Sequence, residues 1–297
     1  MSKLEGLLLG ILQGLTEFLP VSSSGHLVIA QHYIPNFKQS GVLFDAMLHF
    51  GTTMAVIIYF WRDIKALLSA FIPGRQGWGQ VLTFDISGSE HNGCNERREK
   101  CQMSRPDPRI HRKIVGLIGV GTVFTGLIGV VFEDYFIRLF SSVTTASSML
   151  LVTGGLLLAA GLIRQTKRNE ADLNVMDAIY IGVAQGIAII PGISRSGATI
   201  STGLFRGING VVAAKFSFLL SIPAVLGAVF LESRHINLMD SGEITTYVLG
   251  TLSAFITGLV AIRFLLEVIK KNRLRIFAYY CFLMGGLSLV FRIVNVF

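Results

Sequence analysis

Two apolar segments of this chain are each interrupted near the middle by a short polar stretch. The first runs from residue 4 to residue 34, and Pro-Val-Ser-Ser-Ser-Gly interrupts it at residues 20–25. A transmembrane helix needs about 20 consecutive apolar residues, so neither arm is long enough to cross a bilayer comfortably. Non-helical backbone at membrane depth is tolerated only where protein or water covers it. The segment therefore predicts a re-entrant helical hairpin at residues 4–34, which enters and leaves the membrane on one side.

Two ionisable residues, Glu17 and His26, flank this break. A charged side chain at the centre of a membrane helix costs at least about 3 kcal/mol, so such residues usually face the protein interior or a wet cavity and mark a functional site. A secretory signal peptide that begins at Lys3 is the alternative interpretation. It is disfavoured because Glu17 interrupts the apolar region and no small-residue cleavage motif follows.

The second interrupted segment, at residues 173–205, repeats the first at a fixed distance of 172 residues. One shift that relates two separate regions indicates an internal repeat rather than chance. The prolines depart from this register by one residue, so the two breaks need not have the same shape. The aligned positions are Gln13-Gly14 with Gln185-Gly186, Ser22-x-Ser24-Gly25 with Ser194-x-Ser196-Gly197, Phe44 with Phe216, and Leu48 with Leu220.

The composition is that of a membrane protein. Of the 297 residues, 52% are hydrophobic and 15% are charged, whereas soluble domains are about 25% charged. We predict an all-α polytopic membrane protein with an inverted-topology repeat, built from six transmembrane helices plus two re-entrant hairpins. Repeat 1 would cover residues 1–165 and repeat 2 residues 173–297, and an odd number of spans per repeat would invert the second copy. The predicted spans are 42–61, 114–131 and 143–163 in repeat 1, and 211–231, 244–262 and 276–296 in repeat 2.

Lysine and arginine residues are distributed unequally between the two sides of this predicted topology. Twenty fall on the side that receives the polar loop 62–113, and five fall on the side of the N-terminus. By the positive-inside rule the loop side is cytoplasmic, so both termini and the site are expected toward the outer face of the plasma membrane. The net charge of +8 does not indicate a nucleic-acid partner, because the basic residues cluster between apolar spans.

Two further groups of polar residues have both a structural and a functional interpretation. Asp45 and His49 lie one helical turn apart on the first predicted span, where they either support the site or form a structural pair inside the bundle. In the polar loop, a zinc site is disfavoured because the spacing H-x2-C-x6-C-x9-H is no familiar zinc pattern. The residues concerned are His91, Cys94, Cys101 and His111.

The two breaks together predict a binding site for phosphate. Tips of inverted hairpins can meet near the middle of the membrane, and helix starts there present free backbone N–H groups that attract anions. Arg195 adds a planar, two-pronged clamp for phosphate oxygens. Glu17 cannot bind phosphate directly because both are negative, so it would hold a divalent cation or act as a base. These residues predict a phosphate or diphosphate site with a metal ion.

Each of these residues also has a purely structural interpretation. Glu17 and Arg195 could form a buried ion pair that joins the hairpins, His26 could be a hydrogen-bonded interior histidine, and serines beside a helix break are often N-caps. The rival functional class is a secondary transporter or lipid flippase, because inverted repeats with broken helices are typical of transporters. A channel or a structural role comes third.

The two motifs also resemble those of a known family. Gln13-x-x-x-Glu17 followed by Leu-Pro-Val-Ser-Ser-Ser-Gly-His26, together with Pro191-Gly-Ile-Ser-Arg-Ser-Gly-Ala-Thr199, is similar to the motifs of the undecaprenyl-diphosphate phosphatases of the BacA/UppP family. The family pattern is Glu or Gln, three residues, then Glu, followed by PGxSRSxxT. The resemblance covers nearly the whole chain in span order, and the long polar loop near residues 76–110 is the departure from it.

The resemblance implies an enzyme that hydrolyses undecaprenyl (polyprenyl) diphosphate to the monophosphate and phosphate. Such an enzyme recycles the lipid carrier of cell-wall glycan synthesis and confers bacitracin resistance. The implied cofactor is Mg²⁺ or Ca²⁺. The partners considered include a second copy of the chain in a homodimer. Glu17, with Gln13, would bind the metal or act as a base, Ser23 would be the nucleophile unless water attacks, His26 would transfer a proton, and Arg195 would hold phosphate. The implied substrate-binding positions are Gln13, Ser22, Ser24, Gly25, Ser194, Ser196, Gly197 and Thr199.

Overall fold

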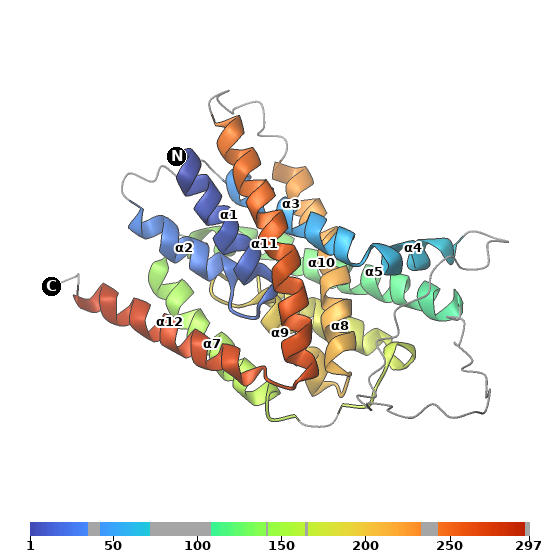
Figure 1. Cartoon of the computed structure of the whole chain (residues 1–297). Helices are drawn as coiled ribbons and strands as arrows, with labels where there is room; N and C mark the ends of the chain where they lie inside the picture. The colour runs from blue at the N-terminus through green and yellow to red at the C-terminus, as the bar shows by residue number, and fades with distance from the viewer. Residues whose placement is uncertain (35–41, 72–107, 141, 164–165, 233–242, 295–297) are drawn as a thin grey trace, which may run out of the picture.

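Both interrupted segments fold as two helices joined by a short break (Figure 1). α1 (Lys3–Phe18) and α2 (Ser23–Tyr33) form the first pair, and α8 (Val175–Ile187) and α9 (Arg195–Phe205) form the second. The two helices of each pair pack against each other. The bounds of α9 are those of α2 moved by 172 residues, so the register of the repeat in the sequence also holds for the helices.

The computed structural model describes residues 1–34, 42–71, 108–140, 142–163, 166–232 and 243–294. These residues are largely helical, and the β-pairing among them is one isolated bridge between Arg168 and Ile208. The remaining elements are α3 (Val42–Tyr59), α4 (Trp61–Ser69), α5 (Pro108–Val131), α6 (Glu133–Phe140), α7 (Val143–Ala160), a 3₁₀ turn η1 (Glu170–Asp172), α10 (Gly210–Glu232), α11 (Ile244–Lys270) and α12 (Arg275–Val294).

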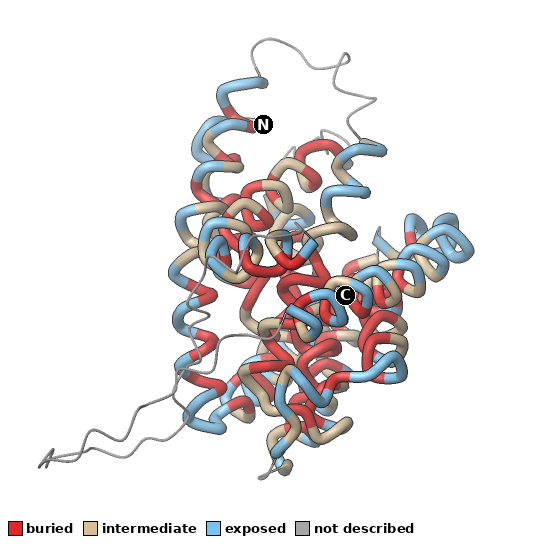
Figure 2. Tube along the Cα trace, turned by 90° about the vertical axis from the view of Figure 1, so that its right-hand side faces the viewer, coloured by how far each residue is buried: buried red, intermediate tan, exposed pale blue. Residues whose placement is uncertain are grey.

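Five of these helices, α5, α7, α10, α11 and α12, are long and apolar enough to cross a membrane. The bent pair of α3 and α4 makes a sixth span if it is counted as one. Buried residues gather inside the bundle, whereas the outward faces of the long helices are exposed (Figure 2). These faces carry large apolar side chains, such as Val123 and Leu127 on α5 and Leu283 and Leu287 on α12. Such faces suit contact with lipid, and the chain is a multi-pass helical membrane protein.

The sequence does not predict the two short helices α4 and α6. α4 lies in the predicted polar loop 62–113, and α5 already begins at Pro108, so both ends of that loop are helical. The chain bends by 72° between α3 and α4, and the apolar side of α4 is buried through Ala66 and Leu67. Of the four residues weighed as zinc ligands, His111 is buried on α5, whereas His91, Cys94 and Cys101 lie outside the described residues.

Each hairpin packs on a helix from the other half of the chain. α1 lies against α11, and α8 lies against α5. Both contacts use a glycine at the same repeat position: a Cβ at Gly10 would lie 2.2 Å from the carbonyl oxygen of Gly250, and a Cβ at Gly182 would lie 2.5 Å from that of Gly121. Small residues of this kind let membrane helices approach closely.

The exchange of partners extends to the rest of the bundle. α3 packs on α10, and α7 packs on α12, so the helices at equivalent places in the two halves meet each other. The aligned residues Leu48 and Leu220 are both fully buried and contact the helices that hold Gly250 and Gly121. This pairing is what an inverted repeat predicts, while the repeat limits 1–165 and 173–297 stay a prediction.

Candidate active site

The two breaks meet inside the bundle. A Cβ at Gly25 would lie only 3.0 Å from Cα of Gly192. The Ser196 hydroxyl donates to the backbone carbonyl of Leu19 across the two breaks, at 3.3 Å. The first turns of α2 and α9 therefore lie close together. Free backbone N–H groups and the helix dipole make such helix starts favourable places for negative charge.

Both helix starts are capped in the same way. Ser22 Oγ accepts the N–H of Gly25 at 3.2 Å, and Ser194 Oγ accepts the N–H of Gly197 at 3.0 Å. In each break, the hydroxyl of the capping serine also lies 3.3 Å from that of the serine two residues later. These contacts show the capping role that serines often have at helix starts. The backbone differs, because Ser22 has a φ of +67°, which is strained for a residue with a side chain.

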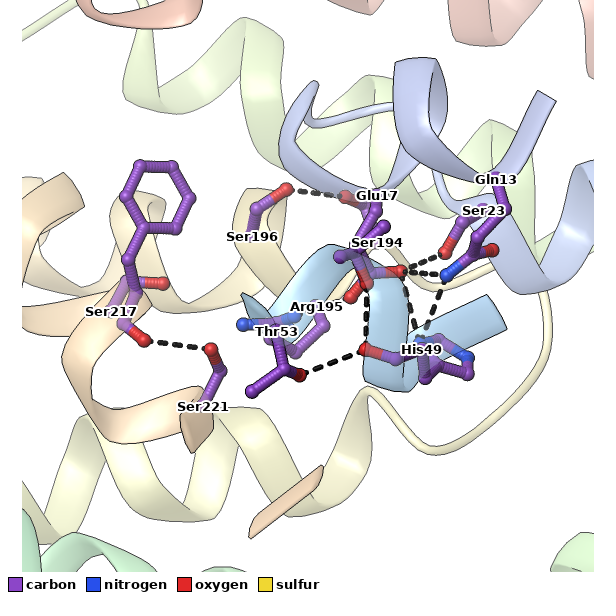
Figure 3. Close-up of polar contacts among 12 residues, drawn as sticks. Gln13, Glu17, Ser23, His49, Thr53, Ser194, Arg195, Ser196, Ser217 and Ser221 are labelled. Carbon is purple, nitrogen blue, oxygen red and sulfur yellow. Dashed lines mark hydrogen bonds and ion pairs between the residues drawn. The ribbon is translucent and has the colours of Figure 1, made fainter. Parts of the chain in front are cut away.

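Glu17, at the end of α1, is the centre of the polar cluster between the breaks (Figure 3). It is 6% exposed. Its Oε1 forms an ion pair with Nη2 of Arg195, while its Oε2 accepts hydrogen bonds from the Ser23 hydroxyl at 2.5 Å and from the Gln13 amide at 2.9 Å. A buried carboxylate requires such partners. Four residues that the sequence predicts for the site thus converge on one point.

The structure distinguishes three serines that are chemically alike in the sequence. Ser23 is the one that donates to Glu17, whereas Ser22 caps α2 and the Ser24 hydroxyl lies 3.3 Å from that of Ser22. Ser23 is also the first residue of α2. Its hydroxyl therefore combines a helix start, which favours an incoming anion, with a carboxylate that can accept its proton, as an activated nucleophile requires.

His49 joins the cluster from α3. Its Nδ1 lies 3.0 Å from Nε2 of Gln13 and 3.4 Å from Oε2 of Glu17. Because Gln13 Nε2 can only donate, the Nδ1 atom of His49 accepts from it in this arrangement. Asp45, one turn before His49, instead accepts a hydrogen bond from the Gln31 side chain on α2 at 2.9 Å. The signal for His49 is present in the sequence as an ionisable residue within an apolar span.

Other predicted site residues lie beside this cluster. His26 has Nδ1 2.7 Å from a backbone carbonyl of the first break and Nε2 2.9 Å from the hydroxyl of Tyr280. The Thr199 hydroxyl donates to the carbonyl of Arg195 at 2.8 Å and lies 2.5 Å from the Ser217 hydroxyl. The sequence gives no signal for Tyr280 and Ser217, because neither belongs to a motif.

Two buried atoms of the cluster have no hydrogen-bond partner among the described residues, namely Nη1 of Arg195 and Oε1 of Gln13. An unpaired buried polar atom costs about 1–3 kcal/mol and calls for an explanation. Nη1 is a donor that fits a phosphate oxygen, and Oε1 is a carbonyl oxygen of the kind that binds Mg²⁺ or Ca²⁺. The described residues contain no group of three or more His, Cys, Asp or Glu side chains that could hold a metal.

The fold and the cluster define a multi-pass helical membrane protein whose polar site is built jointly by two helical hairpins. The chain matches the family model described as "Bacitracin resistance protein BacA" over residues 6–287 and belongs to that family. It is 44% identical to the undecaprenyl-diphosphatase of Syntrophotalea carbinolica over 289 residues, which cover 97% of this chain and 98% of the relative. The undecaprenyl-diphosphatase of Alkaliphilus metalliredigens is 39% identical over 98% of this chain and 99% of the relative.

Proposed function

We propose that this protein hydrolyses undecaprenyl diphosphate to undecaprenyl phosphate and inorganic phosphate. The observation that carries the proposal is the Glu17 carboxylate, which accepts from Ser23 with one oxygen and pairs with Arg195 through the other. Phosphoryl transfer needs an attacking oxygen in line with the leaving group and positive charge on the transferred phosphoryl. The lipid part of the proposed substrate is taken from the names of the relatives, which are undecaprenyl-diphosphatases.

In the proposed reaction, the Ser23 hydroxyl attacks the terminal phosphorus. As its oxygen bonds to phosphorus, Glu17 takes its proton, the bridging P–O bond breaks, and undecaprenyl phosphate leaves. Water then attacks the phosphoserine, the bond between phosphorus and the Ser23 oxygen breaks, and phosphate is released. The Ser23 oxygen takes back the proton from Glu17, which restores the hydroxyl and the carboxylate. In the alternative path a water molecule attacks directly, Glu17 takes the proton of that water, and Ser23 orients it. Both paths use Glu17 as the base. In the first path the proton moves along the 2.5 Å hydrogen bond from Ser23 to Glu17.

Arg195 and the helix starts stabilise the charge that develops on the phosphoryl oxygens. Nη2 of Arg195 is engaged by Glu17, while Nη1 is buried without a partner among the described residues. The free nitrogen can therefore bind a phosphate oxygen without breaking the ion pair. Donors fixed in a site that excludes water contribute more than the same donors in water, because they need no reorganisation during the reaction.

A divalent cation fits the same site. Glu17 and the unpartnered Oε1 of Gln13 would hold Mg²⁺ or Ca²⁺ together with substrate phosphate oxygens. The cation would neutralise charge on the diphosphate. The remaining predicted substrate-binding residues lie at the starts of α2 and α9 around this site. They are Ser22, Ser24, Gly25, Ser194, Ser196, Gly197 and Thr199.

The wider role proposed for the protein is recycling of the lipid carrier used for cell-wall glycans at the outer face of the plasma membrane, with bacitracin resistance as a consequence. The excess of lysine and arginine on the opposite side of the predicted topology supports this orientation. The apolar outer faces of the helices suit a substrate whose tail stays in the bilayer.

A phosphate-release assay tests the proposed reaction. Purified protein in detergent micelles is given a polyprenyl diphosphate and Mg²⁺ or Ca²⁺, and Glu17→Gln serves as the matched control. We expect release from the wild type and little from the variant. The packing between halves would also suit a transporter or flippase, but detergent has no compartments, so transport cannot register. Equal release from both proteins, or none from either, would contradict the proposal.

A further inference from the structure

α12 contacts the first break through two consecutive residues. The Tyr280 hydroxyl lies 2.9 Å from Nε2 of His26, and the two rings lie nearly parallel at 9° with centroids 5.6 Å apart. The next residue, Cys281, is buried and donates from Sγ to the carbonyl of Pro20 at 3.7 Å. A helix from the end of the chain thus supports the turn that precedes Ser23.

These hydrogen bonds fix the tautomer of His26. Its Nδ1 lies 2.7 Å from the backbone carbonyl of Ser22, and a carbonyl can only accept, so Nδ1 carries the proton. In the neutral ring Nε2 is then the acceptor, and the Tyr280 hydroxyl donates to it. Both ring nitrogens are therefore engaged, and the ring cannot turn without losing two hydrogen bonds.

The carbonyl that His26 holds belongs to the strained residue of the break. Ser22 has a φ of +67°, and its carbonyl also accepts the backbone N–H of His26 at 3.2 Å. Strained backbone persists only where surrounding contacts over-determine it. Ser23 follows directly and donates to Glu17, so the conformation of Ser22 sets where the Ser23 hydroxyl points.

The second break is supported differently. There the Thr153 hydroxyl of α7 donates to the carbonyl of Gly192 at 2.9 Å and accepts the N–H of Ser194 at 3.1 Å. α7 contacts the second break and α12 the first, so each break is braced by a helix from the other half. Only the first of these braces acts through a histidine beside the proposed nucleophile.

We propose that Tyr280 is a positioning residue for the reaction. This inference rests on the proposed function. Its hydroxyl holds the His26 ring in the Nδ1–H tautomer, and the ring holds the strained Ser22 and thereby the Ser23 hydroxyl on Glu17. Tyr280 acts through His26 and does not touch the reacting atoms.

Tyr280→Phe keeps the ring and removes the hydroxyl. We expect kcat for phosphate release to fall about five- to tenfold, the scale of one lost hydrogen bond, while KM and the melting temperature stay close to those of the wild type. Tyr279→Phe is the matched control, because Tyr279 is the neighbouring tyrosine and is 62% exposed; it should leave kcat unchanged. Equal kcat for Tyr280→Phe and Tyr279→Phe would overturn the proposal.

A double-mutant cycle separates positioning from a merely structural role. In a His26→Ala background, adding Tyr280→Phe should not lower kcat further, because the acceptor is already gone. An undiminished effect in that background would contradict the proposal.

The tautomer itself gives a readout that needs no turnover. ¹⁵N-NMR of labelled histidine in the detergent-solubilised protein should show His26 as the Nδ1–H form, with the Nε2 resonance shifting in Tyr280→Phe and not in Tyr279→Phe. If the wild type also releases no phosphate, the proposed function fails, while this spectrum still decides whether the Tyr280 hydroxyl holds the His26 tautomer. An Nε2–H form in the wild type would overturn the inference.

Discussion

Replacing Arg195 distinguishes a phosphate clamp from a residue that only closes a buried ion pair. In Arg195→Ala, Glu17 keeps the Ser23 hydroxyl at 2.5 Å and the Gln13 amide at 2.9 Å but loses its positive partner. Removing one member of a buried pair costs about 3–5 kcal/mol. The two remaining donors and the 17% exposure of the Arg195 side chain place the expected loss of stability near the lower end of that range.

The expected loss of activity is larger than instability alone explains. The variant also loses Nη1, the donor that is free to bind phosphate. Since each 1.36 kcal/mol is about tenfold in rate, a loss of the same 3–5 kcal/mol from the transition state lowers phosphate release by roughly two to four orders of magnitude. Arg195→Lys keeps the charge but loses the planar fork, so it should retain a small residual rate.

The double variant Glu17→Gln/Arg195→Ala decides between the two roles. Both charges are gone, so no unpaired buried charge remains and the melting temperature should recover toward that of the wild type. Phosphate release should stay absent, because the base and the clamp are both missing. The measurements are melting temperature and phosphate release in detergent for both single variants and the double. An active double variant would refute the catalytic interpretation and leave a structural bridge.

Three further expectations follow from the sequence and the structure. Ser23→Ala should lower phosphate release by at least about 100-fold with little change in melting temperature, and a rate within twofold of the wild type would remove Ser23 from the mechanism. Gly192→Ala should lower the free energy of unfolding by about 1–3 kcal/mol and with it the melting temperature, because Gly192 has a φ of +95° and a Cβ there would lie 2.1 Å from a backbone carbonyl of α7. Gly155→Ala, where a Cβ meets open space, should leave the melting temperature unchanged. A cysteine that replaces Ser2 should react with an impermeant thiol reagent in intact cells while the native Cys94 should not, and labelling of Cys94 would invert the predicted topology.

The convergence of Gln13, Glu17, Ser23 and Arg195 could be predicted because each residue lies in or near one of the two breaks. Polar residues in an apolar segment must be covered by protein or water, and the repeat relates the two breaks. The role of Tyr280 could not be predicted in this way. It lies 254 residues from His26 on a helix without a motif, and only the packing of the two halves brings the rings together.

The ends of the helices are a second feature that the sequence does not predict fully. α11 runs to Lys270, eight residues beyond the predicted span 244–262, because Arg263 and Glu267 end the apolar run without ending the helix. α4 and α6 are missed for a related reason. Each is short and has charged residues on one side, so hydropathy over a window of about 19 residues treats them as loop.

The site depends on what the two halves share and equally on where they differ. Both breaks present a helix start with the same serine cap, which is the general requirement for holding an anion. The charges are not repeated: Ile189 stands 172 residues after Glu17, and Ser23 stands 172 residues before Arg195. If each half carried the same charged residue, like charges would face each other where the breaks meet. Because the carboxylate lies in one half and the guanidinium in the other, the packing that joins the halves also neutralises the cluster and completes it.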